Sequence, residues 1–145
     1  MSLFAACGGG VEVDSPHLDR SERAACDGFL DALPSTLEGL DERDDVSPDD
    51  APARAWGDPA VVVVCGAGMP DDFTEVSPCE QINDVGWYVR PEEFADQDAS
   101  LDMTTIGFRP AVRLQVPAEH RPPADVLVTV SEAVKAQLTR VGRCS

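Results

Sequence analysis

Four consecutive valines at residues 61–64 constrain the fold of this chain more than any other feature. They follow Asp58-Pro59 and lead into Cys65-Gly66, so turn-forming residues bound a β-branched run that is too short for a helix. A continuous apolar run of this kind predicts a strand that is buried on both faces. We therefore expect the rest of the chain to pack around this strand.

The remaining apolar patterns predict an α+β domain. Apolar residues recur at helical spacing over 19–33 and over 124–141, so we expect one helix near each end of the chain. Strand-like runs lie at 86–90, 101–108 and 111–116. Together with the valine run they predict a small, mostly antiparallel sheet of about four strands, packed against the N- and C-terminal helices in two layers.

The composition is strongly acidic, with 27 Asp and Glu residues against 11 Lys and Arg and a formal net charge of −16. Such a chain repels phosphate backbones and anionic headgroups, which disfavours nucleic-acid binding. The acidic stretch 41–50 lacks the mid-loop glycine and the terminal glutamate of an EF-hand loop. We therefore predict a solvated loop there, with no metal site and no cofactor.

Five cysteines, without a C-x-x-C pair or a zinc-type spacing, indicate disulfides formed in an oxidising compartment. Cys26, Cys65, Cys79 and Cys144 lie in or beside predicted packed elements, and four cysteines allow three pairings. We predict Cys65–Cys79, which would close the loop after the valine strand, and Cys26–Cys144, which would join the two helices. The alternative is a set of buried free thiols in a cytosolic protein.

The fifth cysteine, Cys7, follows Phe4-Ala5-Ala6 and precedes three glycines, a pattern similar to a bacterial lipobox. In that motif a signal peptidase cleaves ahead of the cysteine, whose thiol carries the lipid. Phe4 stands where leucine is usual, and no hydrophobic signal helix precedes it, so we expect a truncated precursor. We predict that residues 1–17 are a lipobox remnant and flexible tether and that 18–145 form one disulfide-bonded domain. A stray terminal thiol is the alternative.

The sequence has no G-x-S-x-G, P-loop or H-E-x-x-H motif. His17 and His120 both fall in loop-like segments, which argues against a catalytic triad. Acidic residues are so frequent that no carboxylate pair stands out. As a possible ligand groove we predict Trp56, Trp87 and Arg109, because aromatic rings can line a groove and a guanidinium can bind an anionic group. Core packing and surface ion pairing are the alternatives.

Several stretches together resemble an actinobacterial family of predicted secreted proteins and lipoproteins, catalogued as domain of unknown function 3515. They are Ala25-Cys26, Leu33-Pro34, Trp56-Gly57-Asp58-Pro59-Ala60 through Cys65-Gly66, Cys79, Gly86-Trp87, the run 104–112 and Cys144. The likeness covers about residues 25–144, and its most specific piece is the Trp-Gly-Asp-Pro approach to the strand that ends in Cys-Gly. The resemblance implies a location in the cell envelope and brings no activity or catalytic residues.

These observations predict an uncharacterised cell-envelope lipoprotein that presents a non-enzymatic binding or interaction surface. Lipidated Cys7 would anchor it to the outer face of the cell membrane, and the partner would be an unknown envelope protein or a small ligand. The alternative is an extracytoplasmic hydrolase that uses a carboxylate pair. A third option, divalent-cation binding by the acidic loop, predicts a melting shift in millimolar calcium.

Overall fold

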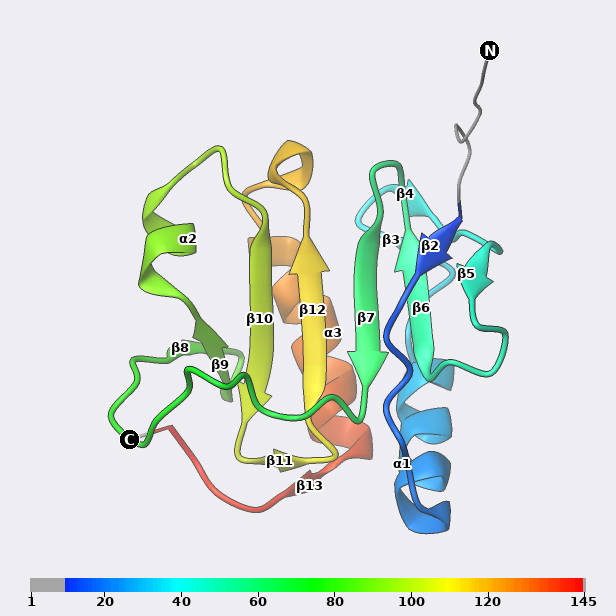
Figure 1. Cartoon of the computed structure of the whole chain (residues 1–145), viewed down its shortest axis with the longest axis horizontal. Helices are drawn as coiled ribbons and strands as arrows, with labels where there is room; N and C mark the ends of the chain where they lie inside the picture. Colours follow the sequence, from blue (N-terminus) through cyan, green and yellow to red (C-terminus); the bar gives the residue numbers. More distant parts are fainter. Residues whose placement is uncertain (1–9, 145) are drawn as a thin grey trace.

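The computed structural model describes residues 10–144 and places a six-stranded antiparallel sheet at the centre of the fold (Figure 1). The strand order is β6-β7-β12-β10-β9-β8. These strands are β6 (Ala53–Trp56), β7 (Val61–Cys65), β12 (Val112–Val116), β10 (Leu101–Ile106), β9 (Val85–Val89) and β8 (Glu80–Ile82). The predicted α+β class with a mostly antiparallel sheet is confirmed, but the two-layer, four-stranded description matches only roughly.

The two strands that the prediction missed are β6 and β8, which form the edges of the sheet. Their sequences, Ala-Arg-Ala-Trp and Glu-Gln-Ile, are short and partly polar. Edge strands are commonly short and polar because such sequences discourage pairing with another chain. Neither strand therefore carries the apolar run by which the central strands were recognised.

Strand β7 is buried along its whole length, as the valine run predicted. Val61 and Val63 belong to the main hydrophobic core, whereas Val62 and Val64 belong to a smaller cluster with Ala55 on the opposite face of the sheet. Successive side chains of a strand point to opposite faces, so an uninterrupted valine run fills both cores at once.

Helices α1 (Arg20–Asp31) and α3 (Ala124–Gln137) pack on one face of the sheet, which we call the helical face (Figure 1). Helix α1 begins at a capping box: the Glu22 N–H donates to the Asp19 carboxylate over 2.8 Å, and the Asp19 N–H donates to the Glu22 carboxylate over 3.0 Å. Apolar residues of both helices, including Phe29 and Val130, are fully buried in the main core.

The C-terminal helix is shorter than the predicted 124–141. It ends at Gln137, and β13 (Thr139–Arg140) follows and pairs with β11 (Phe108–Arg109). Leu138 still packs in the core, which explains why it continued the apolar stripe in the sequence. The short helix α2 (Pro91–Ala95) and a 3-10 turn (Ala118–His120) complete the helical structure of residues 10–144. None of the helices in this range is long and apolar enough to cross a membrane.

The opposite face of the sheet is covered only in part, by two stretches, of which one runs along β6 and β7 and the other crosses β12 and β10 (Figure 1). The first is residues 10–18, which we call the strap. The second is the connection 66–79 between β7 and β8, which we call the crossing loop. Two small ribbons flank the sheet. β2 (Val11–Glu12), within the strap, pairs with β5 (Val46–Ser47), and β3 (Thr36–Leu37) pairs with β4 (Leu40–Asp41), with Leu37 in the main core on the helical face.

The strap corrects the prediction that residues 1–17 are a flexible tether, as far as residues 10–17 are concerned. β2 pairs with β5 in parallel, and the Val13 N–H donates to the Ser47 carbonyl over 3.0 Å. Val11 and Val13 pack against the small apolar cluster of Val62 and Val64. The alternation of valine with acidic residues over 11–14 is the strand signal that the glycines before it obscured. Cys7 lies outside the described residues.

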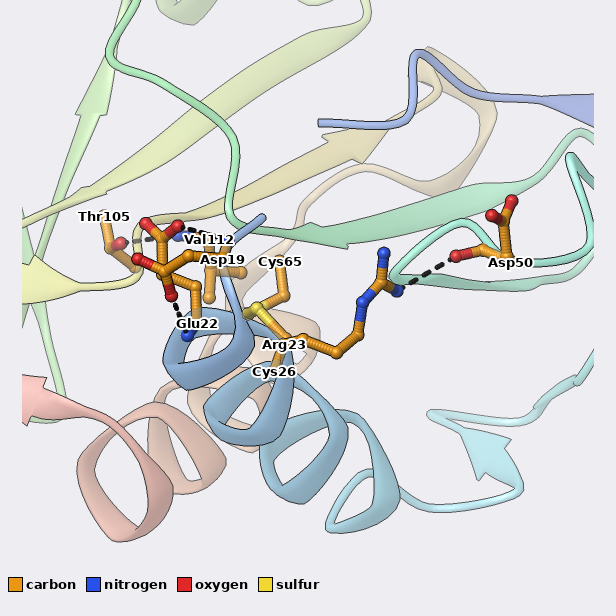
Figure 2. The surroundings of a disulfide bond; sticks show 8 residues. All are labelled: Asp19, Glu22, Arg23, Cys26, Asp50, Cys65, Thr105 and Val112. Carbon is orange, nitrogen blue, oxygen red and sulfur yellow. Dashed lines mark hydrogen bonds between the residues drawn. A yellow bond between two sulfur atoms is a disulfide. The ribbon is translucent and has the colours of Figure 1, made fainter. Parts of the chain in front are cut away.

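Two disulfides join the four predicted cysteines, but the predicted pairing is wrong. Cys26 bonds to Cys65, and Cys79 bonds to Cys144. Figure 2 shows that the first bond joins the side of α1 to the end of β7. Cys65 has the same parity in β7 as Val61 and Val63, so it faces the helices and meets α1 rather than the loop that follows it.

Candidate functional site

The predicted groove of Trp56, Trp87 and Arg109 does not form. Both tryptophans are fully buried on the helical face. Their indole N–H groups donate to the Pro34 carbonyl over 3.1 Å and to the Ser131 hydroxyl over 2.9 Å, so each is a satisfied core residue. Arg109 is exposed at a hollow of about 410 Å³ that neither tryptophan lines. The alternative of core packing is correct for the tryptophans.

A different cluster occupies the second face of the sheet, where two rows of polar side chains cross β12, β10 and β9. In one row Arg113 is paired with Thr104, which is paired with Tyr88. The other row contains Gln115 and its partner Asp102, beyond which Arg90 continues the line just after β9. We call these residues the polar face: Tyr88, Arg90, Asp102, Thr104, Arg113 and Gln115. On β9 and β12 these residues alternate with apolar residues of the main core.

Ion pairs hold the polar face in a fixed arrangement. Arg113 donates two hydrogen bonds to the Asp102 carboxylate, over 2.8 and 2.7 Å, and Arg90 donates two to Asp72, over 2.8 and 3.2 Å. The Nη1 atom of Arg90 lies 3.6 Å from Asp102 and 3.7 Å from Glu93. Hydrogen bonding to Asp102 raises the pKa of Arg113, and hydrogen bonding to Asp72 raises that of Arg90. Both guanidinium groups are thus fixed and charged.

The crossing loop is attached to the polar face at two points. Asp72 bonds to Arg90, and the neighbouring Phe73 packs edge-on against Tyr88 with ring centroids 5.3 Å apart. Tyr88 is 4% exposed, and this burial, followed by the charge of Asp72, raises the pKa of its hydroxyl. The loop therefore lies over the polar face and is attached to it on the β9 side.

Between the loop and the sheet lies a hollow of about 290 Å³, which we call the polar hollow. Residues 68–71 of the crossing loop form one side, and four polar-face residues form the other: Arg90, Asp102, Thr104 and Arg113. A second hollow of about 330 Å³ lies beside it under the strap and shares Gly68 and Arg113 with the first. Arg113 therefore stands between two adjoining spaces that are walled by both covering segments.

Thr104 is the most informative residue of the polar hollow. Its side chain is 1% exposed, yet its hydroxyl has no hydrogen-bond partner among residues 10–144. The adjacent Thr105 is equally buried, but its hydroxyl accepts the Val112 N–H over 2.9 Å (Figure 2). Buried polar groups are almost always paired, so an unpaired hydroxyl lining a hollow points to a partner that binds there.

Other candidate sites are occupied by structural contacts. In the acidic stretch 41–50, Arg43 bonds to Asp45 over 2.7 Å, and Glu42 bonds to Arg54. His120 lies 2.8 Å from the Pro59 carbonyl oxygen. Within the part of the chain that the structure describes, no three His, Cys, Asp or Glu side chains are grouped so that they could hold a metal ion.

The fold and the polar hollow define a disulfide-bonded α+β domain with a helical face and a polar, partly covered face. The chain belongs to the DUF3515 family, described as a protein of unknown function, whose family model matches residues 9–142. Comparisons with curated proteins and with solved structures find no significant match. The family match spans the strap, the crossing loop and the whole polar face, and it assigns no activity to them.

Proposed function

We propose that this protein is a cell-envelope lipoprotein whose domain is a non-enzymatic binding module, with the polar hollow as its binding site. The observation that carries the binding role is the buried, unpartnered hydroxyl of Thr104 between two arginines that carboxylates hold in place. Fixed polar groups in a concave site are what a selective binder needs, because their ordering cost is met before the ligand arrives.

The proposed location outside the cytoplasmic membrane rests on the two disulfides and on the lipobox-like sequence at Cys7. Disulfides persist in oxidising compartments and are rare in the reducing cytosol. A strap that begins at residue 10 would place the domain only a few residues from a lipid on Cys7. This arrangement keeps the domain close to the membrane surface.

The test of location uses the natural full-length gene product in its own cells. We expect mass spectrometry of the membrane fraction to find a lipid on Cys7, and we expect Cys7→Ser to release the protein from the membrane. A Cys7→Ser protein that stays with the membrane, or a wild-type protein with a free Cys7 thiol, contradicts the anchor.

The test of the binding role is a search for turnover, which the alternative, a hydrolase with a carboxylate pair, requires. We expect the purified protein not to hydrolyse ester, glycoside or phosphate substrates. Turnover that Asp102→Asn abolishes, while the circular dichroism of the variant matches wild type, would establish the hydrolase instead.

A further inference from the structure

We infer that the ligand of the polar hollow is a neutral, polyhydroxylated molecule of the saccharide class. The inference rests on the proposed binding role and adds the chemistry of the ligand. Three properties of the site lead to it: its arginines already pair with carboxylates, it retains unused hydrogen-bond donors and acceptors at fixed positions, and part of its wall is apolar.

The ion pairs around the hollow argue against an ionic ligand. Two guanidinium groups, of Arg90 and Arg113, pair with three carboxylates, of Asp72, Glu93 and Asp102, and the carboxylate of Asp71 also lines the hollow. An anion would meet this excess of negative charge and the −16 charge of the whole chain. Both oxygens of Asp72 and of Asp102 are already bonded to arginine, and a cation beside Asp71 would meet the two guanidinium groups that line the same hollow. A neutral polar ligand encounters neither obstacle.

The hydrogen-bonding groups left over match hydroxyl groups. The Thr104 hydroxyl can both donate and accept, as can the amide of Gln115 in the adjoining hollow. The Nη1 atom of Arg113 carries N–H donors that no residue in 10–144 accepts, and the oxygens of Asp102 keep further lone pairs. Donors and acceptors therefore occur together on one wall, and vicinal hydroxyls, each a donor and an acceptor, satisfy both kinds.

The opposite wall supplies an apolar contact. Met69 and Pro70 of the crossing loop line the polar hollow, and Met69 is 40% exposed for a large apolar side chain. A saccharide ring carries C–H groups on its faces and hydroxyls around its rim, so it can place one face on these residues and turn its hydroxyls to the sheet. Methionine suits this contact because its flexible thioether adapts to an irregular surface.

The experiment is a titration followed by the ¹H–¹⁵N resonances of the intact disulfide-bonded protein. The neutral probes are glucose, galactose, mannose, N-acetylglucosamine and disaccharides of these; the charged probes are phosphate, acetate and ethanolamine. We expect at least one neutral saccharide to bind with a dissociation constant of about 1 mM or tighter, shifting Gly68, Thr104 and Arg113. Binding at this site by none of the saccharides overturns the inference.

Two variants show which contacts bind the probe. Thr104→Val removes the unpartnered hydroxyl while keeping the shape, and we expect about five- to tenfold weaker binding. Arg113→Lys keeps the charge but loses the fixed planar donors, and we expect a loss of about tenfold or more. The matched control, Arg109→Lys, changes an exposed arginine outside both hollows that adjoin Arg113 and leaves affinity unchanged.

The outcomes separate the ligand class from the binding role. If phosphate or acetate saturates the same resonances more tightly than every saccharide, and Arg113→Lys keeps that affinity, the site binds anions and the saccharide inference is wrong. The proposed binding role survives that result. Hydrolysis of a saccharide probe during the titration would instead refute the non-enzymatic role while confirming the ligand class.

Discussion

The two faces of the sheet differ in whether their buried polar side chains have hydrogen-bond partners. On the helical face both buried polar side chains within residues 10–144 have a partner: Ser131 accepts the Trp87 indole N–H, and Thr105 accepts the Val112 N–H. On the polar face Thr104 is just as buried and has none within residues 10–144. The helical face is thus complete in itself, whereas the other retains unused bonding capacity. This difference locates function on the polar face more directly than any sequence motif.

The faces also differ in how they are closed. Two amphipathic helices and the Cys26–Cys65 disulfide seal the helical face. The strap and the crossing loop cover the other face, where the apolar cluster is much smaller, and two adjoining hollows remain beside Arg113. Segments with few buried apolar contacts open at lower free energy than a packed core. Stability should therefore depend on the helical face, and ligand binding on the polar face.

The largest loss in the free energy of unfolding is expected on removal of the Cys26–Cys65 disulfide, which lies on the helical face. Its residues are 39 apart, so the chain-entropy treatment gives about 4 kcal/mol for the cross-link. Cys26→Ala with Cys65→Ala also removes fully buried sulfur, so we expect a loss of at least that size in urea unfolding. The matched control is Cys79→Ala with Cys144→Ala, whose separation of 65 gives a similar entropy but whose cysteines are only half-buried. A larger loss in the control would contradict the assignment of stability to the helical face.

The next largest loss in the free energy of unfolding is expected on removal of the hydrogen bond between Trp87 and Ser131. Ser131→Ala leaves the Trp87 indole N–H buried without its acceptor, which should lower the free energy of unfolding by about 1–3 kcal/mol. Urea unfolding followed by tryptophan fluorescence measures the loss. Ser131→Cys, which keeps a weak acceptor of similar size, should recover part of it. Equal stability of wild type and Ser131→Ala would show that the bond contributes nothing.

Two neighbouring threonines, Thr104 and Thr105, allow a direct comparison of what a buried hydroxyl contributes to stability on each face. Thr105→Val removes the acceptor of the Val112 N–H and should cost about 1–3 kcal/mol. Thr104→Val removes a hydroxyl without a protein partner, so stability should stay within about 0.5 kcal/mol of wild type or rise. Urea midpoints of the two single variants, measured side by side, make the test. A Thr104→Val protein that loses as much as Thr105→Val would mean that the Thr104 hydroxyl is paired within the fold.

Much of the helical face could be predicted from sequence, because its signals are local. The valine run, the capping residues at Asp19 and the periodicity of α1 and α3 each lie within one element. The cysteine pairing was missed because it depends on which element lies over the end of β7. The parity of Cys65 with Val61 held a clue, since a side chain facing the helices cannot reach a loop on the other face.

The polar face could be predicted only in pieces. Alternation with apolar residues along β9 and β12 indicates that Tyr88, Arg90, Arg113 and Gln115 lie away from the main core. Their meeting depends on the order β12-β10-β9, which brings Asp102 between the arginines, and strand order is a non-local property. The prediction of a groove at Trp56 and Trp87 was wrong for the same reason, because the face on which each residue lies depends on the non-local arrangement of the strands. Their type suggested a ligand site, but both occupy positions that face the helices and are core residues.

A small loss in the free energy of unfolding is expected from substitution of Glu42, which pairs with an arginine at the end of helix α1. Arg54 donates to the Leu30 and Leu33 carbonyls over 2.7 and 2.8 Å, at the C-terminal end of α1, where helix carbonyls lack partners. Glu42 holds this guanidinium through a hydrogen bond of 2.8 Å, and that bond lowers the pKa of Glu42 below its ordinary value of 4.5. Because the Glu42 side chain is 34% exposed, we expect Glu42→Gln to cost only about 0.5–1 kcal/mol at neutral pH.

The pH dependence gives this prediction its sign. A carboxylate whose pKa is lowered by folding stabilises the protein above its unfolded pKa, and this contribution disappears as the pH falls through the folded value. The difference in unfolding free energy between wild type and Glu42→Gln should therefore be full at pH 7 and shrink as the pH drops below 4.5. Asp27→Asn, at an exposed position of α1, is the control for removing a surface carboxylate. A charged partner of Arg54 must lose its effect when it is protonated. A difference in unfolding free energy between wild type and Glu42→Gln that stays constant down to pH 3 would therefore mean that Glu42 acts through packing.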